Sequence, residues 1–141
     1  MRLLWLTWCW ASASALRFRE DGTFKIVQFS DPQVGHFRLD QCMDLTTEEH
    51  RHACSAQNTT AFMRRVLARE RPDLVVFIGD FIFSYVSTLW TGPTLEGVLR
   101  PVVEAGVPFA AVLGNHDTDG LLARTWTRRR IMTYVASLPG S

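Results

Sequence analysis

Three runs of apolar and β-branched residues along the chain predict three buried strands. The first covers residues 24–30 and follows a turn at Asp21-Gly22. The second covers residues 74–78, and the third covers residues 109–113. The second run is continuously apolar, which is typical of a strand covered on both faces of a sheet.

Between and after these strands, apolar residues recur at three- and four-residue spacing, which predicts helices. The first helix begins at Thr59 or Thr60 and ends near Glu70, with inward positions Phe62, Met63, Val66 and Leu67. The second begins at about Thr94, is interrupted by Pro101 and is capped by Gly106. A third covers residues 124–137, with inward positions Ile131, Met132 and Val135.

This alternation of strands and helices predicts an α/β fold, a layered βαβαβ unit with a sheet flanked by helices. Residues 33–57 have no clear period and are interpreted as a long insertion. Residues 16–141 are expected to form one domain that ends before a second half of the fold. Parallel strands joined by crossovers bring their carboxyl ends to one edge of the sheet.

Composition limits the function classes. The 141 residues are 47% hydrophobic and 21% charged, which fits one globular unit. Lys and Arg number 15 against 14 Asp and Glu, so no basic field indicates a nucleic-acid partner. A small phosphate-bearing substrate stays open, because bound metal ions supply positive charge that side-chain counting misses. The oligomeric state is not determined by these features.

The first fifteen residues predict a signal peptide. Arg2 precedes an apolar run from Leu3 to Trp10, and small residues follow to Ala15. This predicts a protein of the secretory pathway, extracellular or in a vacuole-like compartment, without a stable membrane anchor. The alternative is an amphipathic or uncleaved anchor.

Two further features agree with a secretory compartment. Cys42 and Cys54 are most simply paired as a disulfide that closes the insertion. Asn58-Thr59-Thr60 is a glycosylation sequon, which predicts an exposed loop.

Polar residues with ligand chemistry follow all three strands. Asp31 ends the first, Gly79-Asp80 ends the second, and Gly114-Asn115-His116-Asp117 ends the third. Each is ordinary turn chemistry when taken alone. Together they place three carboxylates, an amide and an imidazole at the edge where open α/β sheets bind ligands. Such oxygen donors suit Mg, Mn, Zn or Fe.

At these residues the chain resembles the calcineurin-like metallophosphoesterases, and within them the small purple-acid-phosphatase-related branch of plants. The resemblance covers residues 17–138. It is carried by Ser30-Asp31, by Asn58 to Phe62, by Pro72 to Asp80 and by Val112 to Asp117, and by the motif from Leu16 to Ile26.

The resemblance implies a phosphatase with a binuclear site of Fe, Zn or Mn ions that activates a hydroxide, and a small phosphate ester as substrate. Asp31 would bind the first metal ion, Asp80 would bridge both, and Asn115 would bind the second. Gln33 stands where the family has a histidine and offers a weaker carbonyl ligand. His116 would donate to the phosphate or leaving group, and Asp117 would orient its ring.

The family also draws three histidines from its carboxyl-terminal half, which this sequence does not contain. An alternative is therefore a catalytically inactive or truncated secreted protein that binds a ligand without turnover. His36, His50 and His52 lie in the insertion, and only His36 is near Asp31 in sequence. We expect these histidines to be solvated.

Two other interpretations fit the sequence less well. Arg128 to Arg130 could meet a phosphate, but three cations oppose the dipole at a helix start, so a solvated face is expected. A nucleotide-binding Rossmann domain shares the βαβ pattern, but no G-x-G-x-x-G follows the first strand.

Overall fold

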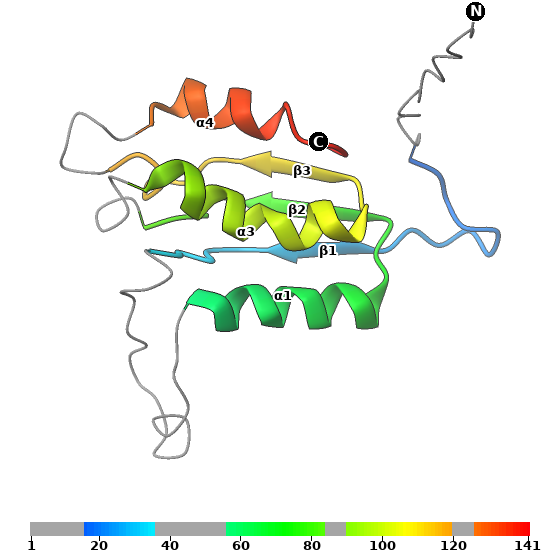
Figure 1. Ribbon diagram of the computed structural model, residues 1–141. Coiled ribbons are helices and arrows are strands. Elements are labelled where there is room, and N and C mark those ends of the chain that lie inside the picture. The colour runs from blue at the N-terminus through cyan, green and yellow to red at the C-terminus, as the bar shows by residue number, and fades with distance from the viewer. Residues whose placement is uncertain (1–15, 36–55, 84–89, 120–125) are drawn as a thin grey trace, which may run out of the picture.

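The computed structural model describes residues 16–35, 56–83, 90–119 and 126–141. Its strands are β1 (Ile26–Phe29), β2 (Leu74–Ile78) and β3 (Phe109–Val112), and they form one parallel sheet in the order β1-β2-β3. Its helices are α1 (Ala56–Glu70), α3 (Thr91–Ala105) and α4 (Arg128–Val135) (Figure 1). The predicted α/β class and the predicted order of elements are confirmed.

Several sequence-based predictions lie outside the described residues. These are the signal peptide at residues 1–15, the Cys42–Cys54 pair, the three histidines of the insertion and the expected helix start at Arg124. No helix in the described ranges is long and apolar enough to cross a bilayer.

The register of the strands sets which side chains form the core. Phe29 lies beside Phe77, and Val75 lies beside Phe109. All four are buried, and the ring centroids of Phe29 and Phe109 lie 5.7 and 6.2 Å from that of Phe77. The helices contribute the other half of this core with Met63, Leu67, Leu95, Val98, Leu99, Val102, Ile131 and Val135.

The opposite side of the sheet is uncovered. By register its residues are Ile26, Gln28, Leu74, Val76, Ile78, Ala110 and Val112, and we call them the open face. Ile26, Ile78 and Val112 are 54%, 42% and 56% exposed. Burial of β2 on both faces was expected, but no described element covers this one. Figure 1 shows α3 crossing in front of the strands, with α1 and α4 to either side.

Two inward positions were wrongly predicted. Phe62 is 53% exposed on α1, and Met132 is 36% exposed on α4. The buried residues of α1 include Ala56, Thr60, Met63 and Leu67, a narrower stripe than the apolar sequence suggested. Asn58, placed in a loop by its sequon, lies exposed in the first turn of α1.

Helix α3 begins at Thr91, three residues before the predicted start at about Thr94, and so includes Pro93 in its first turn. The first turn of a helix tolerates proline, since its N–H groups have no partners within the helix. Gly92 is needed there, because a Cβ would lie 2.8 Å from the indole of Trp126. Gly106 ends the helix in the left-handed conformation, and Pro101 lies inside the helix, as predicted.

Asp73 joins the start of β2 to the segment before β1. Its carboxylate accepts hydrogen bonds from the backbone N–H of Lys25 at 2.6 Å and from Nε of Arg19 at 3.0 Å. The bond from Lys25, followed by that from Arg19, lowers the pKa of Asp73. Since the folded pKa lies below the unfolded one, the carboxylate stabilises the fold above about pH 4. That contribution is lost as the pH falls through the folded pKa.

We therefore expect Asp73→Asn to unfold at lower denaturant concentration than wild type at pH 7, with a difference that shrinks below about pH 4. Urea titrations at several pH values measure this difference. Glu20→Gln is the control, since Glu20 is exposed in the same segment. A difference for Asp73→Asn that does not vary with pH would contradict the expected linkage.

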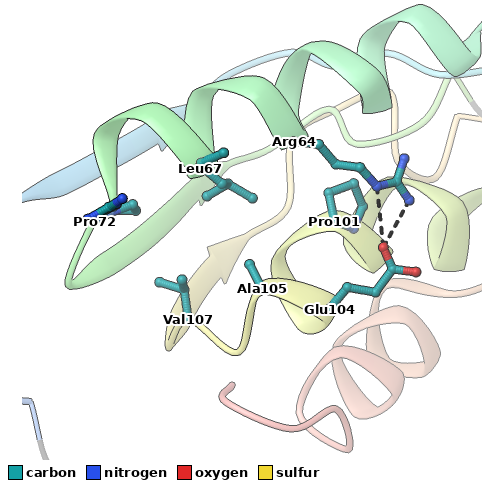
Figure 2. Close-up of a pocket in the computed structure, with 9 residues that line it drawn as sticks. Arg64, Leu67, Pro72, Pro101, Glu104, Ala105 and Val107 are labelled. Atoms are coloured by element: carbon teal, nitrogen blue, oxygen red, sulfur yellow. Dashed lines mark hydrogen bonds and ion pairs between the residues drawn. The ribbon is translucent and has the colours of Figure 1, made fainter.

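A cavity of about 470 Å³ lies between α1 and α3, next to the starts of β2 and β3 (Figure 2). Leu67, Pro101 and Ala105 give it an apolar lining. Arg64 and Glu104 form an ion pair across it at 3.0 Å. Because the polar strand ends lie at the other end of the sheet, this cavity is separate from them.

Candidate metal centre

Two glycines allow the ends of β2 and β3 to approach closely. Gly79 has a φ of 99°, and a Cβ there would lie 2.5 Å from the backbone N of Gly114. A Cβ at Gly114 would overlap the Asp80 carboxylate and lie 2.6 Å from the Asp80 N. Any side chain at either glycine would therefore push the two strand ends apart.

The Asp80 carboxylate occupies the space that these glycines leave. Asp80 is 7% exposed, and its Oδ1 accepts a hydrogen bond from the backbone N–H of His116 at 2.9 Å. Gln33 lies on the other side, with its Nε2 3.5 Å from Asp80 Oδ2. The backbone N–H of Gln33 also donates to the Asp80 carbonyl at 2.9 Å. The structure thus brings together residues from all three strand ends.

Unusual backbone conformations gather at this edge. Four non-glycine residues in the described ranges have positive φ, and three of them lie here: Asp31 at 49°, Gln33 at 40° and Asp80 at 49°. A parallel bridge between Val34 and Ile82 continues the pairing beyond β1 and β2. Strained backbone of this kind is concentrated at functional sites, where the surrounding contacts hold it in place.

Asp117 has a different place from the one expected. It is fully buried, and its carboxylate accepts hydrogen bonds from the backbone N–H groups of Gly114 at 2.8 Å, Asp80 at 3.0 Å and Ile82 at 3.2 Å. Burial raises the pKa of this carboxyl group, against the effect of the backbone hydrogen bonds. Asp117 therefore joins the two strand ends, and the expectation that it orients His116 is revised.

The carboxylate that contacts the His116 ring belongs to Asp119. Its Oδ2 lies 2.5 Å from His116 Nδ1, and this hydrogen bond is the main cause of the raised pKa of His116. The ring of Phe83 meets the imidazole edge-on, with 5.3 Å between ring centroids. Sequence reasoning missed Asp119 because Asp117 and Asp119 both lie within three residues of His116, and no periodicity distinguishes them in a loop.

Asp31 and Asn115 lie at the same edge but are exposed. Asp31 hydrogen bonds with the hydroxyl of Ser30. The oxygen donors of Asp31, Asp80 and Asn115 have the chemistry that hard metal ions prefer. Within the described residues, however, no three His, Cys, Asp or Glu side chains are placed to hold a metal ion. These residues therefore fit part of a metal site and not the whole of one.

The three arginines at the start of α4 are exposed, as expected, and two of them also make specific contacts. Arg128 donates to the backbone carbonyls of Gly114 and Leu113, at 3.0 and 3.2 Å. The guanidinium of Arg130 lies 4.1 Å from the ring centroid of Trp126. The side chain of Arg129 forms no ion pair within the described residues.

Comparisons with known proteins agree with this geometry. The chain is 40% identical over 126 residues to "Probable inactive purple acid phosphatase 14" of Arabidopsis thaliana, a match that covers 89% of the chain. It is 44% identical over 121 residues to "Probable inactive purple acid phosphatase 28" of the same plant, covering 86% of the chain. It is 39% identical over 125 residues to "Phosphatase DCR2" of Saccharomyces cerevisiae, covering 87% of the chain.

The matches span 30%, 29% and 21% of these three relatives, so the chain corresponds to less than a third of each. No solved structure matches it. The family profile described as calcineurin-like phosphoesterase matches residues 24–138, which include all three strand ends. By this match, the chain with its converging strand ends belongs to the calcineurin-like phosphoesterase family.

Proposed function

We propose that this chain provides the amino-terminal part of a metal-dependent hydrolase of phosphate esters. The Asp80 carboxylate is the observation that carries this proposal. It is 7% exposed, and no cationic side chain in the described residues forms an ion pair with it. Buried carboxylates in proteins are normally paired with a cation or bound to a metal ion. Asp80 is therefore the best candidate to bind metal.

In this proposal Asp80 would hold both metal ions, Asp31 the first and Asn115 the second. Iron, zinc or manganese ions suit these donors. When bound, they would supply a hydroxide nucleophile near neutral pH. Gln33 contributes less, because its Nε2 is a donor that already points at Asp80. A half-turn of its amide would offer an oxygen instead.

His116 would act on the leaving group of a small phosphate ester. The backbone N–H of His116 donates a hydrogen bond to the Asp80 carboxylate, and this bond fixes the turn that carries the imidazole ring. The hydrogen bond from His116 Nδ1 to the Asp119 carboxylate raises the pKa of His116, so the protonated imidazole is favoured near neutral pH. A protonated imidazole can donate its proton to the departing alkoxide.

Replacement of Asp80 by Asn tests the proposal. Asparagine keeps an oxygen that can accept the His116 N–H but removes the negative charge. We expect metal binding and aryl phosphate hydrolysis by a complete chain to fall by at least about 100-fold. Equilibrium dialysis with Mn²⁺ and a colorimetric assay measure the two losses. Glu20→Gln is the control, because it changes the net charge of the chain by the same amount. Equal activity in wild type and Asp80→Asn would contradict the assignment.

A second candidate function is ligand binding without catalysis. Gln33 stands at a position where the resemblance expects a histidine, and its amide N–H points at the Asp80 carboxylate. Two of the relatives also carry the words "probable inactive" in their names. Stoichiometric binding of two metal ions by the 141-residue chain would favour the hydrolase over this candidate.

The location of this activity follows from residues 1–15, whose sequence predicts a signal peptide. We propose that the protein works in the secretory pathway or outside the cell. The sequon at Asn58 supports this proposal, because the asparagine is exposed in the first turn of α1.

A further inference from the structure

Arg128 connects helix α4 to the end of β3. Two N–H groups of its guanidinium donate to consecutive carbonyls, Nη1 to Gly114 at 3.0 Å and Nη2 to Leu113 at 3.2 Å. These carbonyls come directly before Asn115. One side chain therefore holds the two backbone carbonyls that lie between the end of β3 and Asn115.

The position of Arg128 in α4 indicates that its hydrogen bonds to the two carbonyls are not incidental. It is the first residue of the helix, after the N-cap Thr127, whose side chain accepts from the Arg130 N–H. A cation at this end of a helix is unfavourable, because it faces the positive end of the dipole. Hydrogen bonds from a charged donor to two carbonyls offset that cost.

Helix α4 also holds the backbone of Arg128 in a fixed position. Ile131 is fully buried and Val135 is 3% exposed, so the helix is anchored in the core. From this helix, Arg128 contacts the carbonyl of Gly114, and the turn after Gly114 leads to His116. The N–H of His116 reaches Asp80 Oδ1 at 2.9 Å. The orientation of the Asp80 carboxylate is thus linked to α4.

We propose that Arg128 is a positioning residue of the candidate metal centre. It holds the turn from Gly114 to His116 in the conformation in which the His116 N–H reaches Asp80. Its role in metal binding rests on the proposed function, whereas its hold on the turn does not. Both links can be measured separately.

The test compares Arg128→Gln and Arg128→Lys with the matched control Arg129→Gln in the 141-residue chain. Amide hydrogen exchange followed by NMR is the first measurement. We expect Arg128→Gln to raise the exchange rate of the His116 amide by about tenfold, because the charged hydrogen bonds to the turn are lost. Arg128→Lys, which keeps the charge but has a single donor nitrogen, should restore part of the protection. Arg129→Gln should have no effect.

The exchange rates of the Val75 and Phe77 amides report the stability of the sheet. If these rise as much as that of His116, Arg128 acts on overall stability and the proposal is overturned. An unchanged His116 amide in Arg128→Gln also overturns it. The second measurement, made on a complete chain, is the affinity for Mn²⁺, which we expect to fall by about tenfold in Arg128→Gln. Absence of Mn²⁺ binding by wild type would count against the proposed function, and the exchange rates would still decide the role of Arg128.

Discussion

Gly79→Ala is expected to lower the free energy of unfolding by about 3–5 kcal/mol, from backbone strain and steric overlap together. Gly79 has a φ of 99°, which an alanine adopts only with strain. Its new Cβ would also lie 2.5 Å from the N and 2.8 Å from the Cα of Gly114, and backbone atoms have little room to move. Urea unfolding followed by circular dichroism measures the loss.

Gly22→Ala separates the two causes. Gly22 has a φ of 79°, but a Cβ there would meet no atom within 4 Å. This variant carries the strain without the overlap, so we expect it to lose about 1 kcal/mol. If Gly79→Ala lowered the free energy of unfolding no more than Gly22→Ala does, the result would contradict the close approach of the two strand ends.

Asp117→Ala should lower the free energy of unfolding by about 4 kcal/mol, because it leaves three backbone N–H groups without their acceptor. These belong to Asp80, Ile82 and Gly114, and the carboxylate that serves them is fully buried. Thermal and urea unfolding both report the change. We also expect the exchange of those three amides to accelerate more than that of Val75.

The matched control is Asp119→Ala, two residues further along the same loop. Asp119 is exposed and contacts the ring of His116. We expect its removal to leave the free energy of unfolding nearly unchanged and to lower the pKa of His116 toward its usual value. Equal stability losses in the two variants would contradict the structural role assigned to Asp117.

The sequence predicted the elements well where a single strong signal acts. The apolar run at residues 74–78 has the bounds of β2, and Gly106 is the left-handed cap of α3. The strand ends were expected at one edge because parallel crossovers require it. The contact between Asp80 and the turn at His116 agrees with that expectation.

The errors have specific tertiary causes. Phe62 has the right spacing for the core, but the stripe that α1 buries is narrower than its apolar residues. Helix α3 starts before the predicted Thr94, and Gly92 in its first turn leaves the space that the indole of Trp126 occupies. Local spacing holds no information on such partners, which come from distant parts of the chain.

The roles of Asp117 and Asp119 could not be assigned for a related reason. Both aspartates follow His116 in an irregular loop, where no periodicity indicates which one points inward. Three backbone N–H groups decide it, because those of Asp80 and Ile82 after β2 and that of Gly114 after β3 all donate to Asp117. Arg128 was likewise missed, because its acceptors are backbone carbonyls that carry no side-chain signal.

The open face has a consequence for how the free chain behaves in solution. Ile26, Ile78 and Val112 lie on it at 42–56% exposure, and its residues by register carry no charge. Apolar surface of this kind associates with other apolar surface, and association that selects the folded state stabilises it by mass action. We therefore expect the melting temperature of the free chain to rise with its concentration, so that its stability depends on the solution as well as on the single molecule.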